Sequence, residues 1–138
     1  MPAKDLYHGA VRAALIKDGW TITHDPLTLR YYKRDVYIDL GAERLLAAEK
    51  ASQKIAVEVK SFTAASAIAA LEEAVGEYIV YQDVLEEIDI ERKLFLAVPD
   101  YAQEGILSEP IGELLVRKHG IHVIVYNADT EEVVAWKP

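Results

Sequence analysis

The sequence contains no cysteine and no long uninterrupted apolar segment. The absence of cysteine excludes disulfide bonds, thiolate catalysis and zinc sites built on thiolates. No apolar run approaches the roughly 20 residues of a membrane-spanning helix, and residues 1–18 lack the basic start and apolar middle of a secretory signal. We therefore expect a soluble, cytoplasmic protein with no membrane association.

Basic residues are scarce relative to acidic ones. The 138 residues include 15 Lys and Arg against 23 Asp and Glu, which gives a formal charge of −8. This balance argues against a surface that binds nucleic acid by phosphate neutralisation alone, so any DNA binding is expected to be weak. One basic cluster is compatible with either a small nucleic-acid contact or a solvated loop. It consists of Arg30, Lys33 and Arg34 beside Tyr31 and Tyr32.

The order of apolar segments predicts the fold class. No linker or repeat divides the chain, which predicts a single domain over residues 1–138. Helical periodicity marks residues 4–17, 64–87 and 108–119. Strand patterns mark residues 20–23, 36–40, 45–50, 54–62, 94–98, 121–126 and 133–136. Because the middle helix must cross over before the next strand can join the sheet, we expect an α/β fold with a mixed β-sheet flanked by helices.

Two charges interrupt the apolar stretch IAVEVKSF, residues 55–62. Side chains two positions apart on a strand share a face, so Glu58 and Lys60 would lie side by side, about 6 to 7 Å apart. An exposed ion pair of this kind contributes about 0 to 1 kcal/mol. A buried pair kept only for structure carries a large desolvation cost. A third interpretation is a site in which Glu58 binds a divalent metal ion while Lys60 orients or activates water beside a phosphate.

An upstream acid is needed to complete such a site, because Mg²⁺ or Mn²⁺ usually takes one or two carboxylates together with water. In VYIDL, residues 36–40, strand alternation places Asp39 on the face opposite the aliphatic side chains. Asp39 can therefore share the face of Glu58. A bulge at Gly41 would change the phase of this strand and leave two rival ligands, Glu43 and Glu49.

An aspartate on one strand followed by Glu-x-Lys on the next resembles the motif of the PD-(D/E)XK nucleases. The match is Asp39 followed by Glu58-Val59-Lys60. The predicted element order over residues 4–98 strengthens this resemblance, which implies a restriction endonuclease-like core.

Three longer segments resemble the XisH family, which is named for control of excision of the fdxN element in cyanobacteria. They are HGAVRAALIKDGWTITHDP at residues 8–26, YIDLGAERLLAAEK at residues 37–50 and IAVEVKSF at residues 55–62. The resemblance implies a nuclease-like fold and a role accessory to a site-specific recombinase, often with a small partner of the XisI type.

The resemblance implies roles for five residues. Asp39 and Glu58 would bind Mg²⁺ or Mn²⁺, and Lys60 would position the attacking water or stabilise developing charge. Gln82 resembles a polar residue that some of these nucleases aim at the site, the alternative being an ordinary polar position beside an apolar stripe. His8 lies on the first helix, where a glutamate is common in the superfamily. It would lie near the metal or serve as a hydrogen-bonded interior histidine.

Two functions follow as alternatives. The first is a Mg²⁺- or Mn²⁺-dependent DNA endonuclease that uses Asp39, Glu58 and Lys60. The second is an accessory factor that keeps the nuclease-like architecture and acts by binding an XisI-type partner or a recombinase. The acidic composition and the missing glutamate on the first helix favour the second function, and a homodimer is compatible with both.

Overall fold

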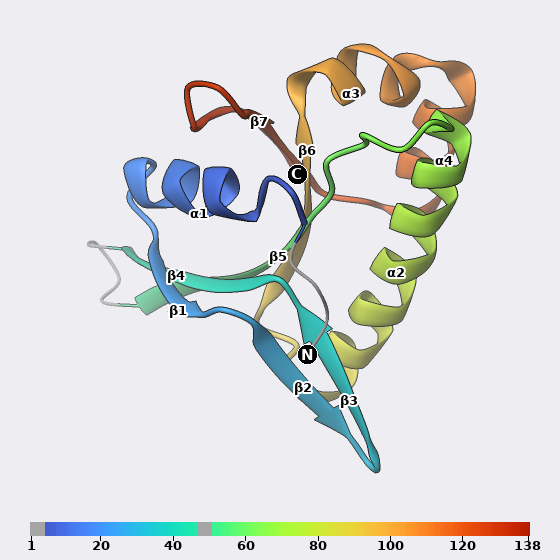
Figure 1. Cartoon of the computed structure of the whole chain (residues 1–138). Helices are drawn as coiled ribbons and strands as arrows, with labels where there is room; N and C mark the ends of the chain where they lie inside the picture. Colours follow the sequence, from blue (N-terminus) through green and yellow to red (C-terminus); the bar gives the residue numbers. More distant parts are fainter. Residues whose placement is uncertain (1–4, 47–50) are drawn as a thin grey trace.

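Two sheets and four helices make up the computed structural model, which describes residues 5–46 and 51–138 (Figure 1). The larger sheet contains β1 (Thr21–His24), β4 (Leu40–Leu46), β5 (Ala51–Val59), β6 (Lys93–Pro99), β7 (Val123–Asn127) and β8 (Glu132–Lys137). The smaller sheet is a hairpin of β2 (Leu27–Tyr31) and β3 (Arg34–Ile38). The helices are α1 (His8–Lys17), α2 (Ala67–Ile88), α3 (Asp100–Glu104) and α4 (Pro110–His119), with a 3-10 turn η1 (Ile106–Ser108). Among the described residues, no helix is both long and apolar enough to cross a membrane.

The larger sheet is mixed, with the order β1-β4-β5-β6-β7-β8. Strand β5 pairs antiparallel with β4 and parallel with β6, and β6 is in turn parallel to β7. The 22-residue helix α2 makes the crossover from β5 to β6. A crossover of this length is what a parallel pair requires. The expected mixed sheet flanked by helices is confirmed.

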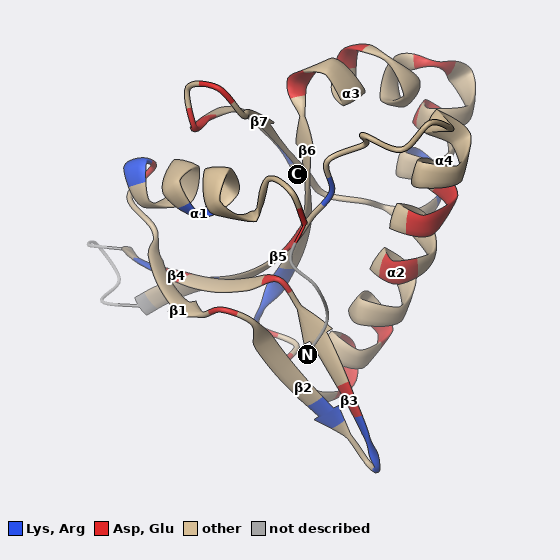
Figure 2. Ribbon diagram, in the orientation of Figure 1, with Lys and Arg blue, Asp and Glu red and all other residues tan. Residues whose placement is uncertain are grey.

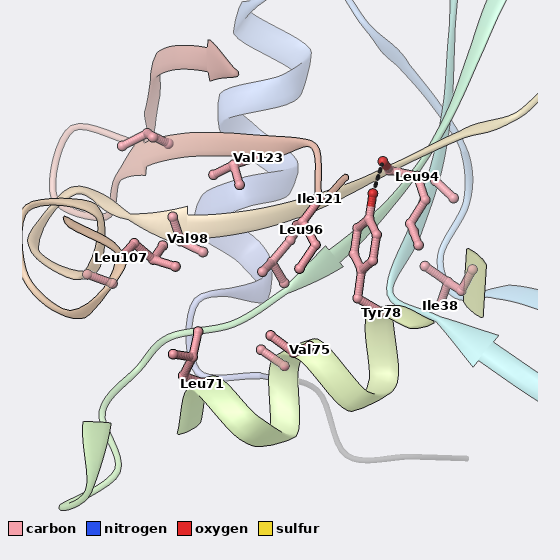
Figure 3. Packing of buried hydrophobic residues seen from close by; sticks show 14 of the residues in the cluster. Ile38, Leu71, Val75, Tyr78, Leu94, Leu96, Val98, Leu107, Ile121 and Val123 are labelled. Carbon is pink, nitrogen blue, oxygen red and sulfur yellow. Dashed lines mark hydrogen bonds between the residues drawn. The ribbon is translucent and has the colours of Figure 1, made fainter. Parts of the chain in front are cut away.

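Alternate residues of β5 face two separate apolar cores. Ile55, Val57 and Val59 belong to the core beneath α1, which also contains Val11 and Leu15 of that helix. On the other face, Ala56 joins a core against α2, η1 and the β2–β3 hairpin. Figure 3 shows this second core, with Ile38, Leu71, Val75, Tyr78, Leu94, Leu96, Val98, Leu107, Ile121 and Val123. The period of two along β5 therefore decides which side chains reach the α2 side.

Helix α4 has the termini that its sequence predicts. Pro110 occupies the first turn, and Gly120 ends the helix with a φ of +59°, a left-handed conformation that glycine adopts without strain. Gly112 lies where α4 meets η1, and a Cβ built on it would be 2.2 Å from the Ile106 carbonyl oxygen. The close packing of α4 on η1 therefore requires glycine at this position.

Several predicted boundaries differ from the structure. The predicted strand over 36–40 is interrupted at Asp39, which lies between β3 and β4. Residues 45 and 46 lie in a strand, as predicted for 45–50, but they are the end of β4 rather than the start of a new strand. Residues 47–50 lie outside the described part. Residues 27–31, which were assigned to no strand and include part of the basic cluster, form β2. The first helix begins at His8 rather than at residue 4, which is itself not described.

Replacing Tyr78 by Phe is expected to lower the free energy of unfolding by about 1 to 3 kcal/mol. The buried hydroxyl of Tyr78 donates to the Leu94 carbonyl at 3.1 Å (Figure 3). It also accepts a hydrogen bond from the His122 backbone N–H at 3.1 Å. Phe leaves both backbone groups without this partner. Urea denaturation with an unchanged m-value measures the loss. Tyr32→Phe, at a side chain that is 83% exposed, is the control and should change stability by less than about 0.5 kcal/mol.

Candidate functional site

A pocket of about 320 Å³ opens on the α2 side of the sheet. It lies between the end of β5, the junction of β3 with β4, and one face of α2. Its lining residues are Asp5, Tyr37, Asp39, Glu58, Val59, Lys60, Glu73, Glu77 and Tyr81. Most of these lining side chains are polar or ionisable, in contrast to the apolar core beside the pocket.

Asp39 and Glu58 meet because β4 and β5 are antiparallel. Leu40 is opposite Val57, so the residue before β4 reaches the end of β5. The backbone N–H of Val59 donates to Asp39 Oδ2 at 2.7 Å, and the backbone N–H of Asp39 donates to Glu58 Oε1 at 3.3 Å. Each carboxylate is thereby oriented by the backbone of the segment that carries the other.

Burial disfavours ionisation of both carboxyl groups. Burial is the main cause that raises the pKa of Glu58, to about 10, and the charge of Asp39 adds to it while Lys60 opposes it. The pKa of Asp39 is also raised, chiefly by burial, although the hydrogen bond from Val59 counteracts part of the effect. Two carboxylates held together in this way share protons unless a cation compensates their charge.

Lys60 extends from the end of β5 toward α2. Its Nζ lies 2.7 Å from Glu77 Oε1, 3.5 Å from Glu73 Oε1 and 3.8 Å from Glu58 Oε2. Burial alone would lower the pKa of Lys60, but the hydrogen bond and charge of Glu77, together with the other two carboxylates, raise it. Burial likewise opposes ionisation of Glu77, yet the contact with Lys60 lowers its pKa. Both members of this pair are therefore ionised at neutral pH.

Two further residues support the pocket. The Tyr81 hydroxyl donates to Glu77 Oε2 at 2.9 Å, and the backbone N–H of Ser61 donates to Asp5 Oδ2 at 3.1 Å. Burial is the main cause that raises the pKa of Tyr81, and the nearby Glu58 charge adds to it. Tyr81 therefore remains a neutral hydrogen-bond donor that fixes the orientation of Glu77.

The structure brings three of the five sequence-predicted site residues into this pocket. Asp39, Glu58 and Lys60 line it together, and the predicted shared face of Glu58 and Lys60 is confirmed. Two are placed elsewhere. Gln82 is not a lining residue, and its Nε2 donates to Glu86 Oε1 at 3.0 Å within α2.

His8 is buried at the start of α1 and does not line the pocket. Its Nε2 lies 2.7 Å from Asp25 Oδ1, and Asp25 also accepts a hydrogen bond from Arg12 Nη1 at 2.8 Å. This arrangement is the hydrogen-bonded interior histidine that was the alternative to a place near the metal. Of the two rival acids, Glu43 does not line the pocket and pairs in register with Lys54 on β5, while Glu49 lies outside the described residues.

The residues of α2 that line the pocket were missed from the sequence. Glu73, Glu77 and Tyr81 are four positions apart, a spacing that puts their side chains on one face of a helix. The prediction followed the apolar stripe of α2 and extended it to Gln82. The polar stripe formed by these three residues, beside the apolar stripe of α2, was the feature of the sequence that could have identified them.

Asp39 and Glu58 are the residues that could hold a divalent cation. The described residues contain no group of three His, Asp or Glu side chains with the spacing of a complete metal site. A hard cation such as Mg²⁺ does not need one, since it commonly binds one or two carboxylates and keeps several water molecules. The two residues fit such an ion, because their carboxylates supply oxygen ligands and a bound cation would neutralise the charge that burial disfavours.

Comparison with known proteins gives consistent results over nearly the whole chain. A family model described as "XisH protein" matches residues 1–134. The crystal structure of an XisH family protein from Nostoc punctiforme PCC 73102 is 34% identical with a TM-score of 0.87, covering 97% of this chain and 100% of that chain. A fdxN element excision controlling factor protein from Anabaena variabilis is 34% identical with a TM-score of 0.88, covering 98% and 100%. A search of curated proteins gave no match.

Proposed function

Since the chain belongs to the XisH family, we propose that it controls the excision of a DNA element through a metal-dependent phosphodiester-hydrolysing site. The similar Anabaena protein is described as a fdxN element excision controlling factor. The observation that carries the proposed chemistry is the convergence of Asp39, Glu58 and Lys60 in one pocket. This convergence supports a restriction endonuclease-like, PD-(D/E)XK type of site.

Asp39 and Glu58 would bind Mg²⁺ or Mn²⁺. When bound, such an ion polarises a phosphoryl oxygen and lowers the pKa of a coordinated water. The two residues keep their carboxylates adjacent through the backbone hydrogen bonds between the β3–β4 junction and β5. They therefore need little rearrangement to bind one cation.

Lys60 serves as a positively charged hydrogen-bond donor. Its contact with Glu77 keeps the ammonium group protonated, so it cannot act as a general base near neutral pH. A fixed positive charge 3.8 Å from Glu58 can orient an attacking water and stabilise the charge that develops on the phosphate. Glu77 positions Lys60, and Tyr81 positions Glu77.

The β2–β3 hairpin supplies a contact for DNA. It projects from the body of the molecule, and its tip carries the basic residues Arg30, Lys33 and Arg34 (Figures 1 and 2). Arg30 is paired with Asp35 at 3.2 Å, which leaves Lys33 and Arg34 without an ion pair in the described part of the chain. Because the whole chain carries a formal charge of −8, this contact would give weak, strongly salt-dependent binding.

A second function is favoured by the charge of the pocket itself. Five acids line it and only one lysine, so without a cation it repels phosphate. An accessory factor that binds an XisI-type partner or a recombinase, alone or as a homodimer, would have no need of phosphate at this position. In that case the acidic pocket would be a retained architectural feature.

Cleavage assays separate these functions. With Mg²⁺ or Mn²⁺, the intact protein is expected to nick supercoiled or branched DNA, and Lys60→Ala is expected to reduce the rate about 100-fold because the stabilising charge is lost. Lys118→Ala, at an exposed lysine of α4, is the matched control and should cleave at the original rate.

Two outcomes would contradict the nuclease proposal. Equal nicking by Lys60→Ala and the intact protein would place the activity outside this pocket. If the intact protein cleaves nothing with either metal ion, alone or with an XisI-type partner, the accessory function replaces the enzymatic one.

A further inference from the structure

A second pocket, of about 440 Å³, lies on the opposite face of the sheet from Asp39 and Glu58. Its lining residues are Asp18, Trp20, Arg44, Gln53, Lys93, Phe95, Trp136 and Pro138. On β5, Gln53 shares its face with Ile55 and Val57, which belong to the core beneath α1. The ten-residue helix α1 is only about 15 Å long. It therefore leaves part of this face uncovered.

Three aromatic rings form one wall of the pocket. The ring centroids of Trp20 and Trp136 are 5.6 Å apart with an interplanar angle of 35°, and Phe95 meets Trp136 edge-on at 5.1 Å. Trp136 Nε1 donates to Asp18 Oδ2 at 3.0 Å, which fixes the orientation of its ring. Trp136 is only partly buried and lines the pocket, so part of the residue remains accessible to a ligand.

Two exposed cations lie over this aromatic wall. The Arg44 guanidinium is 4.5 Å from the centroid of the Trp20 ring, and Lys93 Nζ is 5.4 Å from that of Phe95. Neither cation forms an ion pair within residues 5–46 and 51–138. Asp18, the acid of the pocket, is engaged by Trp136. Against the single carboxylate of Asp18, the two cations leave the side chains of this pocket with a net positive charge, which gives it a local preference for anions within a chain of charge −8.

The wall also contains an unsatisfied donor. Trp20 is 3% exposed, and its Nε1 is buried without a hydrogen-bond partner among the described residues. A buried donor of this kind carries a free-energy cost. The pocket itself combines an aromatic surface with positive charge, while the Trp20 N–H is buried behind that surface.

We propose that this pocket binds a nucleotide, with the base stacked on Trp136 and the phosphate held by Arg44 and Lys93. Bases stack on aromatic side chains irrespective of sequence, and arginine and lysine are the usual phosphate ligands. The pocket volume falls within the range of small-molecule sites, about 300 to 1,000 Å³. The ligand chemistry is that of either a free mononucleotide or an unpaired DNA end. The proposal is independent of the nuclease function, because the two pockets lie on opposite faces.

Tryptophan fluorescence tests the proposal directly, since both tryptophans of the chain line this pocket. The intact protein is titrated, in the presence of a chelator, with dAMP, with deoxyadenosine, with deoxyribose 5-phosphate and with a short single-stranded oligonucleotide. We expect saturable quenching by dAMP or the oligonucleotide, and at least tenfold weaker binding of the two fragments. Stronger binding of dAMP identifies a free nucleotide as the ligand, and stronger binding of the oligonucleotide identifies a strand end.

The variant Arg44→Gln with Lys93→Gln is expected to weaken binding at least tenfold, while Lys118→Gln on α4 leaves it unchanged. Near-UV circular dichroism verifies that the double variant keeps its fold. Isothermal titration calorimetry verifies that the fluorescence quenching reflects binding. The absence of saturable quenching would overturn the proposal. So would equal affinity for deoxyadenosine and dAMP, or undiminished binding by the folded double variant.

Discussion

Replacing Glu58 by Gln is expected to raise the free energy of unfolding by about 2 kcal/mol at pH 7 and to reduce metal-dependent cleavage about 1,000-fold. The two effects have one cause. Glu58 is buried beside Asp39, and both conditions disfavour its charge in the folded protein. The same negative charge on Glu58 is what would bind a metal cation. Gln removes the charge but keeps an oxygen that can accept the hydrogen bond from the Asp39 backbone.

The stability gain should depend on pH in a defined direction. Glu58 has an ordinary pKa of 4.5 and a pKa of about 10 in the fold. Because the folded-state pKa is raised, the folded protein retains a proton that the unfolded chain releases above about pH 4.5. The stability associated with Glu58 is complete below that pH and decreases as the pH rises toward 10. The Gln variant does not titrate, so its advantage should be absent at pH 4 and increase through pH 8.

Urea denaturation at pH 4, 6 and 8 measures this effect, and Glu73→Gln is the control because the Glu73 side chain is 68% exposed. Millimolar Mg²⁺ or Mn²⁺ should raise the melting temperature of the wild-type protein but not of Glu58→Gln, since only the wild type offers both carboxylates. A pH-independent gain, or destabilisation at pH 8, would show that Glu58 is not disfavoured in the way described.

Replacing Gly112 by Ala is expected to lower the free energy of unfolding by about 3 kcal/mol. The added Cβ would lie 2.2 Å from the Ile106 carbonyl oxygen and 2.7 Å from Leu107 Cα. Both are backbone atoms, so relief requires α4 to move away from η1 rather than a side chain to change rotamer. The movement would disturb the core on the α2 side, to which Ile106 and Leu107 belong.

Gly76→Ala is the matched control for this prediction. Gly76 is an exposed position inside α2, and a Cβ there meets no atom within 4 Å. Alanine is the better helix former by about 1 kcal/mol, so this variant should be more stable than the wild type. Urea denaturation of both variants gives the two differences. A Gly112→Ala protein as stable as Gly76→Ala would contradict the close packing of α4 on η1.

The strand that carries Glu58 and ends just before Lys60 could be predicted because its pattern is unambiguous. Its period of two assigns Ile55, Val57 and Val59 to one face, and burial in two cores enforces that assignment. The family could be predicted as well, since the resemblance to XisH proteins is confirmed over residues 1–134. The roles of the site residues in catalysis remain predictions.

The hairpin and the α2 side of the pocket could not be predicted from local pattern alone. Leu27 and Leu29 alternate with Thr28 and Arg30, but the run is short and ends in a basic cluster, so tertiary packing of the two leucines against α2 decides its structure. On α2, the apolar stripe identifies the helix without showing which adjacent polar residues reach β5. That contact depends on the crossing of α2 over the sheet.

The β2–β3 hairpin lies outside the six-stranded sheet and rejoins it at Asp39. Insertions or deletions of residue pairs at its tip would change its length without shifting the register between β4 and β5. A single-residue insertion within β5, by contrast, would exchange the side chains that face the two cores. During evolution the tip of the hairpin is therefore free to diversify in length and sequence, while its leucines in the core and the acidic pocket stay intact.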